Sequence, residues 1–348
     1  DELNSLGVRV SALENKVGNV KLSGDARVRY QNQNDSIEND DSFDYKVDLV
    51  AEAQVNDRTK VTYGLSTNDV RFADNNAASA GSQDDGSANP YTNLANVEYQ
   101  AGSHVTLLAG RYDYQIGNGL GLQYSDTFDG AQATLTSGNF ALTGGYGKFK
   151  EGSGNEDDNG DATNDLLGLK AGYVSLDGTF GNVGAGVYYT QFNHSGTSDA
   201  VVGGDYAKNL DNVFGGYLSL NFGEKWNLLG DYQKVSKDDN NKVFNGVKDE
   251  DADLWGAKLT YGAADQAVKG SWDAWVEYIN ADQNALYGST ASWRSNDLVD
   301  NVKSWGVGVD YTLSKNVVLT VAQSFASEAK VGNDDPEELT DVELNFFF

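Results

Sequence analysis

Cysteine is absent from the 348-residue chain, and proline occurs twice. Without cysteine the protein has neither a disulfide framework nor a thiolate metal site. The scarcity of proline leaves central β-strands undisturbed, because proline cannot donate a hydrogen bond to a strand ladder. Both absences are compatible with a long antiparallel β-structure.

Long hydrophobic runs are also missing. Hydrophobic residues make up 39% of the chain and its mean hydropathy is -0.51, and no run approaches the ~20 apolar residues of a transmembrane helix. The sequence therefore excludes a helical membrane protein. Methionine is absent and the chain begins at Asp1, so we expect a processed or truncated product that lacks its signal peptide and any upstream domain.

Positive charge and histidine are scarce. The chain has 25 Lys and Arg against 52 Asp and Glu, a formal charge of -27, which excludes nucleic acid as a partner and favours the attraction of cations. His104 lies in an expected turn and His194 beside an expected loop, which we place at opposite ends of the expected β-structure. We therefore predict no shared catalytic or metal site, and no enzyme.

Aromatic residues are plentiful, with 19 Tyr, 14 Phe and 6 Trp. The last segment, 341–348, alternates between apolar and polar residues and stops on Phe348, which we take as the membrane-insertion signal of an outer-membrane barrel. Its polar face carries Asp341, Glu343 and Asn345, and its apolar face carries Val342, Leu344, Phe346 and Phe348.

The same alternation recurs from Val20 onward and predicts about sixteen strands. Short turns, among them 56–58, 102–104 and 176–179, alternate with long Asp/Asn/Gly/Ser-rich outer loops, among them 281–300. An even strand number with both ends on one side predicts an all-β, transmembrane antiparallel β-barrel in the bacterial outer membrane, spanning 19–348. The alternative is a soluble β-sandwich or β-helix.

The first 18 residues follow a different period. Spacings of three and four predict the end of an α-helical coiled-coil stalk over 1–18, with Gly18 ending the helix; the alternative is an amphipathic helix packed against or plugging the barrel. The seam is Leu3, Leu6, Val10, Leu13 and Val17.

A coiled coil that runs directly into an acidic barrel, LENKVGNVKLSGDARVRY at 13–30, together with the terminal NFFF, resembles the OmpM-type outer-membrane porins of diderm Firmicutes. The resemblance implies a sixteen-stranded homotrimeric porin that anchors the outer membrane to peptidoglycan through an N-terminal S-layer-homology domain. That domain is absent from this sequence. General porins also share pieces similar to Ala109-Gly110-Arg111-Tyr112 and Phe128-Asp129-Gly130-Ala131.

Between those two pieces lies the segment that we predict to narrow the pore. Its glycines permit a tight inward fold and its charge is low; the alternative is an ordinary surface loop. The predicted constriction residues are Gln115, Ile116, Gly117, Asn118, Gly119, Leu120, Gly121, Leu122, Gln123 and Tyr124.

Charged residues fall on the predicted inward faces of the early strands. Cations set against acids would create a transverse field in the pore; the alternative is a set of salt bridges that solvate the wall. The predicted pore-lining residues are Arg27, Arg29, Lys46, Asp48, Glu52, Lys60, Glu98, Arg111 and Asp113.

Acidic clusters in the predicted outer loops could hold Ca²⁺ or Mg²⁺ that bridges to lipopolysaccharide phosphates, although simple solvated loops are the alternative. We predict no cofactor and no resident metal site. The inward Arg and Lys favour anions, whereas the acidic mouths and the net charge of -27 favour cations; because the excess of negative charge is large, we expect a weak cation preference. The function that we expect is passive diffusion of small hydrophilic solutes and ions; the alternatives are a structural tether with an occluded barrel and an autotransporter-like translocator.

Overall fold

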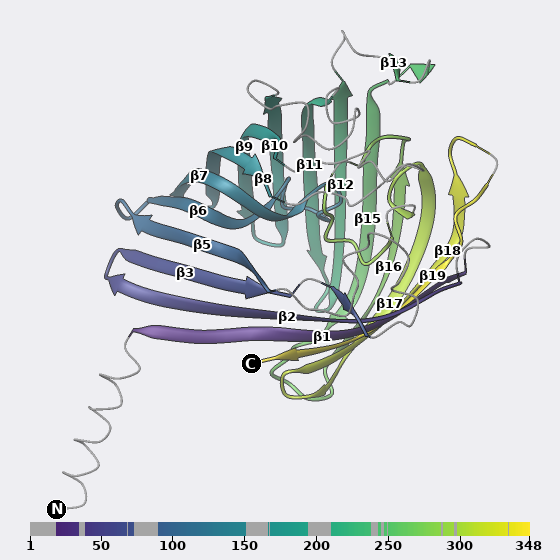
Figure 1. The fold of residues 1–348 in the computed structure, drawn as a ribbon, viewed down its shortest axis with the longest axis horizontal. Coiled ribbons are helices and arrows are strands. Elements are labelled where there is room, and N and C mark those ends of the chain that lie inside the picture. The colour runs from purple at the N-terminus through teal and green to yellow at the C-terminus, as the bar shows by residue number, and fades with distance from the viewer. Residues whose placement is uncertain are drawn as a thin grey trace, which may run out of the picture.

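The chain folds into a closed antiparallel β-barrel (Figure 1). The computed structural model describes residues 19–34, 39–67, 69–72, 90–150, 166, 168–193, 210–237, 243–244, 247–248, 250–286, 288–295, 298–332 and 334–348. The main sheet has 17 strands, of which one is the two-residue β4, so the barrel wall is built of 16 long strands. The predicted coiled coil over 1–18 lies outside the described residues.

Each long strand pairs with its neighbours in sequence. The first half of the wall contains β1 (Val20–Asn34), β2 (Asn39–Asn56), β3 (Thr59–Ser66), β4 (Val70–Arg71), β5 (Tyr91–Gln100), β6 (Val105–Gln115), β7 (Ser125–Ser137), β8 (Phe140–Phe149) and β9 (Lys170–Phe180). The second half contains β10 (Val183–Asn193), β11 (Leu210–Phe222), β12 (Trp226–Lys237), β15 (Ala252–Ala263), β16 (Trp272–Ala281), β17 (Val302–Ser314), β18 (Val317–Ala329) and β19 (Leu339–Phe347). A separate hairpin joins β13 (Val243–Phe244) to β14 (Val247–Lys248).

The barrel is closed by its two terminal strands. β1 pairs with β2 on one side and with β19 on the other. Phe348 extends this seam, because its N–H donates to the Gly24 carbonyl at 3.0 Å and its carbonyl accepts from the Gly24 N–H at 2.8 Å. Closure leaves no exposed strand edge, which is the condition for a β-structure to span a bilayer.

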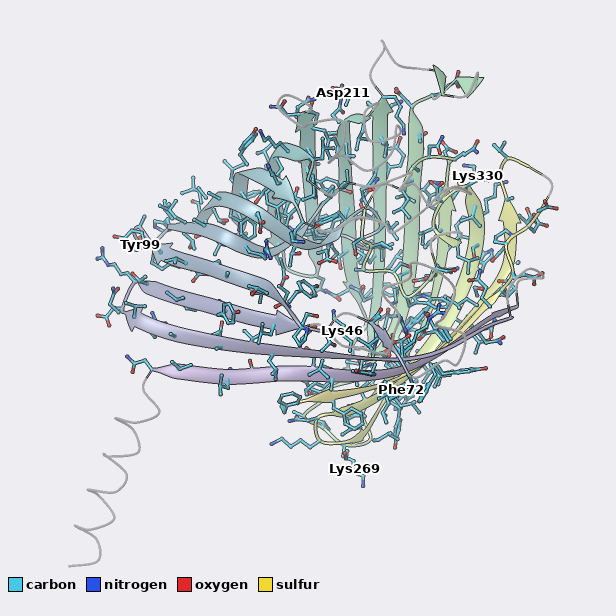
Figure 2. The ribbon with its side chains drawn as sticks, in the orientation of Figure 1. Lys46, Phe72, Tyr99, Asp211, Lys269 and Lys330 are labelled. Carbon is cyan, nitrogen blue, oxygen red and sulfur yellow. The ribbon has the colours of Figure 1, made fainter. Side chains whose placement is uncertain are left out.

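Short turns gather at one end of the barrel and long connections at the other. In Figure 2, Tyr99 and Lys269 mark the end with the short turns, and Asp211 and Lys330 mark the opposite end. The turn expected at 176–179 is wrong: β9 continues to Phe180, and the chain reverses at 181–182. The outward apolar positions continue through Leu176 to Phe180, so the strand pattern does not break where we expected it to.

The outer surface carries two rows of aromatic side chains. Near the long-connection end, Trp255, Tyr278, Trp305 and Phe325 stand side by side on β15 to β18, with successive ring centroids 5.3, 4.8 and 6.4 Å apart. Near the other end, Trp226, Tyr261 and Trp272 form a second row. Aromatic belts of this kind mark the two interfaces of a bilayer.

The lumen has two unlike sides. The charged wall, as we define it, is the lumen face of β1, β2, β3, β5 and β19. The apolar wall is the lumen face of β6 to β12, β15 and β16, which holds a buried cluster that includes Phe128, Phe149, Tyr173 and Tyr188. Within the described residues, no helix is both long and apolar enough to cross a membrane.

Candidate pore constriction

The segment 116–124 connects β6 to β7 and folds into the lumen. Its two ends are held together by the Ile116 N–H, which donates to the Tyr124 carbonyl at 3.0 Å. Its middle reaches the far side of the barrel, where the Leu120 N–H donates to Asp231 Oδ2 on β12 at 3.0 Å. We call this stretch the constriction segment.

Burial of apolar side chains explains the inward fold. Ile116 and Tyr124 are fully buried and Leu122 is 3% exposed, all within the cluster of the apolar wall. Burying a side chain of this size contributes about 1.5–3 kcal/mol relative to leaving it in water. An excursion into solvent would expose all three, so the segment packs inward.

Two glycines make the close approach possible. Gly117 and Gly121 have φ values of 74° and 65°, a region that residues with a Cβ rarely adopt. A Cβ on Gly117 would lie 2.2 Å from the ring of Tyr188, and one on Gly121 would lie 2.9 Å from the Cβ of Ala291. The chain can therefore pass this close to β10 and to the next inward segment because both positions are glycine.

A second segment, 282–301 between β16 and β17, also folds inward. It is bonded to the constriction segment: the Ala291 N–H donates to the Gly121 carbonyl at 3.0 Å, and Gln123 Nε2 donates to the Ala285 carbonyl at 2.6 Å. We expected an outer loop at 281–300, which is wrong for these residues. The apolar Leu286, Leu298 and Val299, fully buried here, were the available signal in the sequence.

One carboxylate organises the start of this second segment. Asp300 accepts hydrogen bonds from the backbone N–H groups of Asn284, Ala285 and Leu286 at 3.1, 2.7 and 3.0 Å. Burial raises the pKa of Asp300 and the three N–H donors oppose that rise. The turn is thus fixed by a side chain that lies at the other end of the same segment.

The tip of the second segment lies against β16 and β17 and reaches the charged wall. The Trp293 carbonyl accepts from Gln31 Nε2 on β1 at 3.4 Å. Arg294 is fully buried and donates to Glu277 at 2.8 Å and to Ser304 at 2.6 Å. Burial lowers the pKa of Arg294, and the nearby Glu277 carboxylate partly offsets this. The second segment is therefore tied to β16, β17 and β1.

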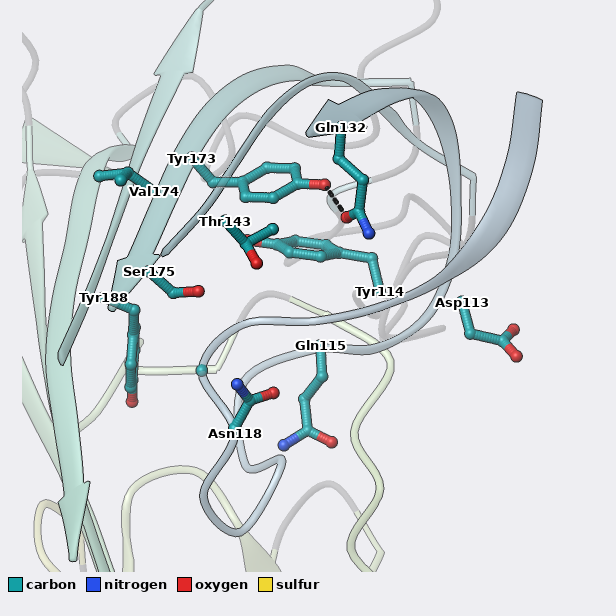
Figure 3. Close-up of a pocket in the computed structure, with 11 residues that line it drawn as sticks. Asp113, Tyr114, Gln115, Asn118, Gln132, Thr143, Tyr173, Val174, Ser175 and Tyr188 are labelled. Atoms are coloured by element: carbon teal, nitrogen blue, oxygen red, sulfur yellow. Dashed lines mark hydrogen bonds between the residues drawn. The ribbon is translucent and has the colours of Figure 1, made fainter. Parts of the chain in front are cut away.

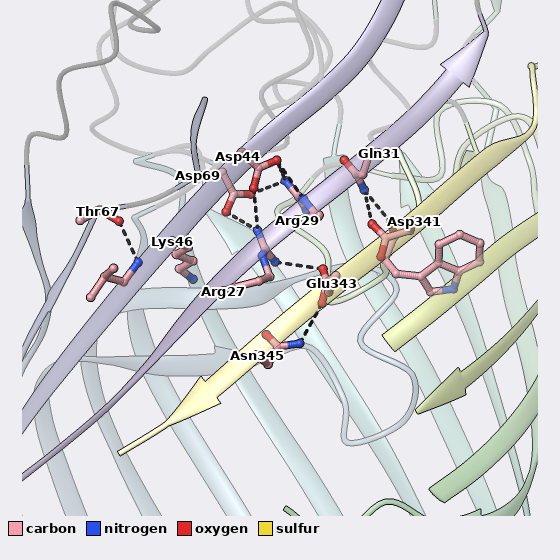
Figure 4. A network of polar contacts seen from close by, with 12 residues as sticks. Arg27, Arg29, Gln31, Asp44, Lys46, Thr67, Asp69, Asp341, Glu343 and Asn345 are labelled. Carbon is pink, nitrogen blue, oxygen red and sulfur yellow. Dashed lines mark hydrogen bonds and ion pairs between the residues drawn. The ribbon is translucent and has the colours of Figure 1, made fainter. Parts of the chain in front are cut away.

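Arg27 and Arg29 lie on the charged wall and are paired with acids from three parts of the chain (Figure 4). Arg29 binds Asp44 at 2.9 Å and Asp69 at 2.8 Å. Arg27 binds Asp69 and lies 3.4 Å from Glu343 on β19. The sequence did not single out these acids as partners of the arginines.

Other predicted pore-lining residues are spread along the charged wall. Lys46 pairs with Asp48 at 3.1 Å. Lys60 lies 3.4 Å from Glu52 and 3.8 Å from Glu98, next to the short turn at 57–58. Cations and acids therefore alternate along one wall, which corresponds to the salt-bridge alternative more closely than to opposed rows of charge.

Arg111 is not a pore-lining residue. It lies opposite Ala95 on β5 and Asp129 on β7, and cross-strand partners share a face. That face also carries Val97 and Leu107, which are 45% and 41% exposed on the outside. Arg111 binds Asp129 through two hydrogen bonds of 2.6 and 2.8 Å there. The polarity of 109–112 does not alternate, so the face could not be assigned from the sequence.

A cavity of about 190 Å³ lies between the constriction segment and the apolar wall (Figure 3). Tyr114 and Tyr173 line the cavity, and their rings stack on each other with centroids 4.2 Å apart. The Tyr173 hydroxyl donates to Gln132 at 2.7 Å. Asp113 and Asn118 also line it. Predicted constriction residues and Asp113 thus meet at one place in the lumen.

The described residues contain no group of three His, Asp or Glu side chains arranged to hold a metal ion. His104 is exposed in the connection between β5 and β6, and His194 lies outside the described residues. Most of the acidic outer segments predicted to bind divalent cations also lie outside them.

Comparisons with known proteins agree on the fold. No family model matches the chain, and no curated protein matches it in sequence. Among solved structures, Salmonella typhi OmpF in complex with daunomycin is similar with a TM-score of 0.62 at 11% identity, covering 96% of this chain and 99% of that one.

Two further porin-like barrels give the same result. A loop L8 deletion mutant of OmpT, an outer membrane protein of Vibrio cholerae, has a TM-score of 0.57 at 15% identity and covers 94% of this chain and 99% of that one. A mutant of the Rh. blastica porin has a TM-score of 0.53 at 13% identity, with 94% and 100% covered. The chain has the 16-stranded fold of outer-membrane porins, and the predicted location in the bacterial outer membrane agrees with it.

Proposed function

We propose that the protein is a non-enzymatic passive diffusion channel of the outer membrane for small hydrophilic solutes and ions. One observation carries the proposal: the constriction segment crosses the lumen from β6 to Asp231 and leaves the charged wall facing it. A narrow passage between a fixed loop and a polar wall selects solutes by size and charge.

The charge of that passage favours cations. Each of Arg27, Arg29, Lys46 and Lys60 is already paired with a carboxylate. Additional acids stand on the same wall, among them Asp25 opposite Asp48. Because the cations are neutralised locally and acids remain in excess, the field in the lumen is negative, in the same sense as the net charge of -27.

Planar-bilayer recording tests the proposal directly. The purified, folded chain should give discrete conductance steps and a reversal potential on the cation side in a salt gradient. Steps in multiples of three would support the homotrimer that the family resemblance implies. A folded barrel that never conducts would contradict the channel.

A matched pair of variants tests the position of the constriction. Asn118→Arg adds a cation to the constriction segment, where Asn118 donates to Asp177 at 2.7 Å. Asn182→Arg adds the same cation to an exposed short turn. We expect the first to lower conductance and cation preference and the second to change neither. Equal effects would show that this segment is not the narrowest point.

A second candidate is a structural tether with an occluded barrel. Its support is the pair of inward segments, which are bonded to each other and reach β1 through Trp293 and Gln31. Absence of conductance from a folded barrel would favour it. The peptidoglycan anchor, the coiled-coil stalk and cation bridges to lipopolysaccharide remain predictions from the sequence, and nothing within the described ranges favours a translocator.

A further inference from the structure

Polar side chains form a patch within the apolar wall, where that wall faces the constriction segment. The strand register places Thr143 on β8 opposite Ser175 on β9. Gln132 on β7 and Tyr173 on β9 lie on either side of Gly145. Directly paired residues share a face of the sheet, and all four of these side chains line the cavity of about 190 Å³. The floor of the cavity is therefore built of hydroxyl and amide groups.

A glycine positions the polar groups of this floor. A Cβ on Gly145 would lie 2.4 Å from the ring of Tyr173, so the ring can lie over β8 because Gly145 has no side chain. The Tyr173 hydroxyl then donates to Gln132 Oε1 at 2.7 Å, as Figure 3 shows. The amide nitrogen of Gln132 has no hydrogen-bond partner among the described residues. It is available to a molecule in the cavity.

The constriction segment supplies the opposite side of the cavity. Asn118 Nδ2 donates to Asp177 Oδ1 at 2.7 Å, and the Ser175 hydroxyl donates to Asp177 Oδ2 at 3.2 Å. Asp177 thus fixes one polar group on the segment and one on the wall. Asn118 is exposed, so the cavity opens to the lumen beside it. A solute in the lumen can reach the polar floor by this opening.

The lining of the cavity limits the class of solute that it can hold. No Lys or Arg lines it among the described residues, so an anion would find no cation there. An apolar solute would leave the amide and hydroxyl groups unpaired. Asp113 is at the edge, and Figure 3 shows its carboxylate pointing away from Gln132 and Ser175. A cation in the cavity would therefore lack a facing acid on the floor.

A neutral polyhydroxylated solute matches this lining. Hydroxyl and amide groups both donate and accept hydrogen bonds, as sugar hydroxyls do. The rings of Tyr114 and Tyr173 add apolar surface for the C–H groups of a sugar. At about 30 Å³ for each water molecule, a cavity of about 190 Å³ has room for roughly six waters, or for one sugar ring in their place.

We propose that the cavity is a binding site for a neutral monosaccharide, held by Gln132 and Ser175 on the wall and by Asn118 on the constriction segment. The inference rests on the diffusion channel proposed above and names a solute class for it. A site at the level of the constriction raises the occupancy of sugars in the lumen above that of other neutral solutes of equal size.

Saturation-transfer NMR of the folded barrel in detergent tests the site, with glucose as the probe. The double variant Gln132→Leu with Ser175→Ala should bind glucose about 25-fold more weakly, because each lost hydrogen bond contributes roughly a fivefold factor. The control Ser219→Ala with Asn221→Leu makes the same kinds of change on β11, outside the cavity, and should bind as the unaltered protein does. Equal binding by the two double variants, whether kept or lost, would overturn the proposal.

Two further probes test the class of ligand. Tetraethylene glycol has a mass similar to that of glucose but only two hydroxyls, and it should give no saturable signal. Saturable binding of ethylammonium in place of glucose would assign the cavity to a cation and overturn the proposal. The single variant Ser175→Ala should bind glucose about fivefold more weakly and serves if the double variant does not fold.

Bilayer recording separates this proposal from the channel itself. Glucose should lower the ion current of the unaltered protein with the half-saturation found by NMR, because Asn118 lies both at the cavity and on the constriction segment. If the barrel conducts and glucose does not bind, the sugar site is wrong and the channel stands. Glucose binding by a folded barrel that never conducts would contradict the channel alone.

Discussion

The two sides of the lumen are built by opposite means. On the charged wall, Arg27 and Arg29 are held by acids from β2, from the stretch before β4 and from β19. On the apolar wall, Phe128 and its neighbours pack ring against ring. The apolar wall provides the surface onto which the constriction segment folds, whereas the charged wall stays polar and faces it.

The difference shows how one barrel can combine a fixed constriction with a polar passage. A segment packs stably where apolar side chains of the segment and of the wall are in contact, and the inward segments make such contacts with the apolar wall. A solute path needs side chains that keep their hydration, which the charged wall supplies. If the division is correct, substitutions on the two sides should affect different properties.

Phe128→Ala should have the largest effect on stability. The ring is fully buried and lies 5.1 Å from both Tyr114 and Phe149, and removing such a side chain costs about 3–5 kcal/mol. Urea unfolding followed by tryptophan fluorescence measures the loss. Phe140→Ala, an outward ring that is 48% exposed, is the control and should lose much less. Equal losses would deny that the apolar wall is a packed core.

The double variant Arg27→Ala with Arg29→Ala should change ion selectivity more than stability. Asp44, with a side chain that is 4% exposed, would lose its cations at a cost of about 1–3 kcal/mol. The reversal potential should move further to the cation side. Lys60→Ala, on the same wall beside a short turn, should move it less. An unchanged reversal potential would remove both arginines from the solute path.

Asp231→Ala should loosen the constriction without changing the charged wall. Asp231 accepts from the Tyr188 hydroxyl at 2.8 Å and from the Leu120 N–H at 3.0 Å. Leaving these buried donors unpaired costs about 1–2 kcal/mol. We expect noisier current with larger mean conductance. Asp231→Asn retains an acceptor oxygen and should be milder; quiet, unaltered current from the alanine variant would contradict the role of Asp231 as an anchor.

Asp300→Asn should have the smallest effect. One amide oxygen can still accept from the Ala285 and Leu286 N–H groups, but the bond to Asn284 is lost, at a cost of about 0.5–1.5 kcal/mol. Asp300→Ala removes all three bonds and should give a clearly larger change in current noise. If both variants behave alike, the three hydrogen bonds do not hold the second inward segment.

The alternation of polarity predicted the barrel and most of its faces. Val342, Val28 and Leu49 fall outward and Glu343, Arg29 and Asp48 inward, because a strand turns successive side chains to opposite faces. The period is a local property, so sequence alone carries it. Arg111 was misplaced because the residues around it, Ala109 and Gly110, do not alternate with it in polarity.

The alternation of polarity could not predict which residues each lumen side chain contacts. Arg27 meets Glu343, and Gln31 meets Trp293, across separations of hundreds of residues. Glycine content predicted that the constriction segment can fold inward, but its anchor on Asp231 depends on the curvature of the closed wall.

The sequence by itself determined the strand type, the two faces of the wall and the acidic character of the protein, because residue order and local periodicity encode these. Tertiary structure decided which acids neutralise the lumen arginines, that 282–301 folds inward beside the constriction segment, and that Arg111 faces outward. These features depend on barrel closure, which brings distant strands to fixed positions around a common lumen.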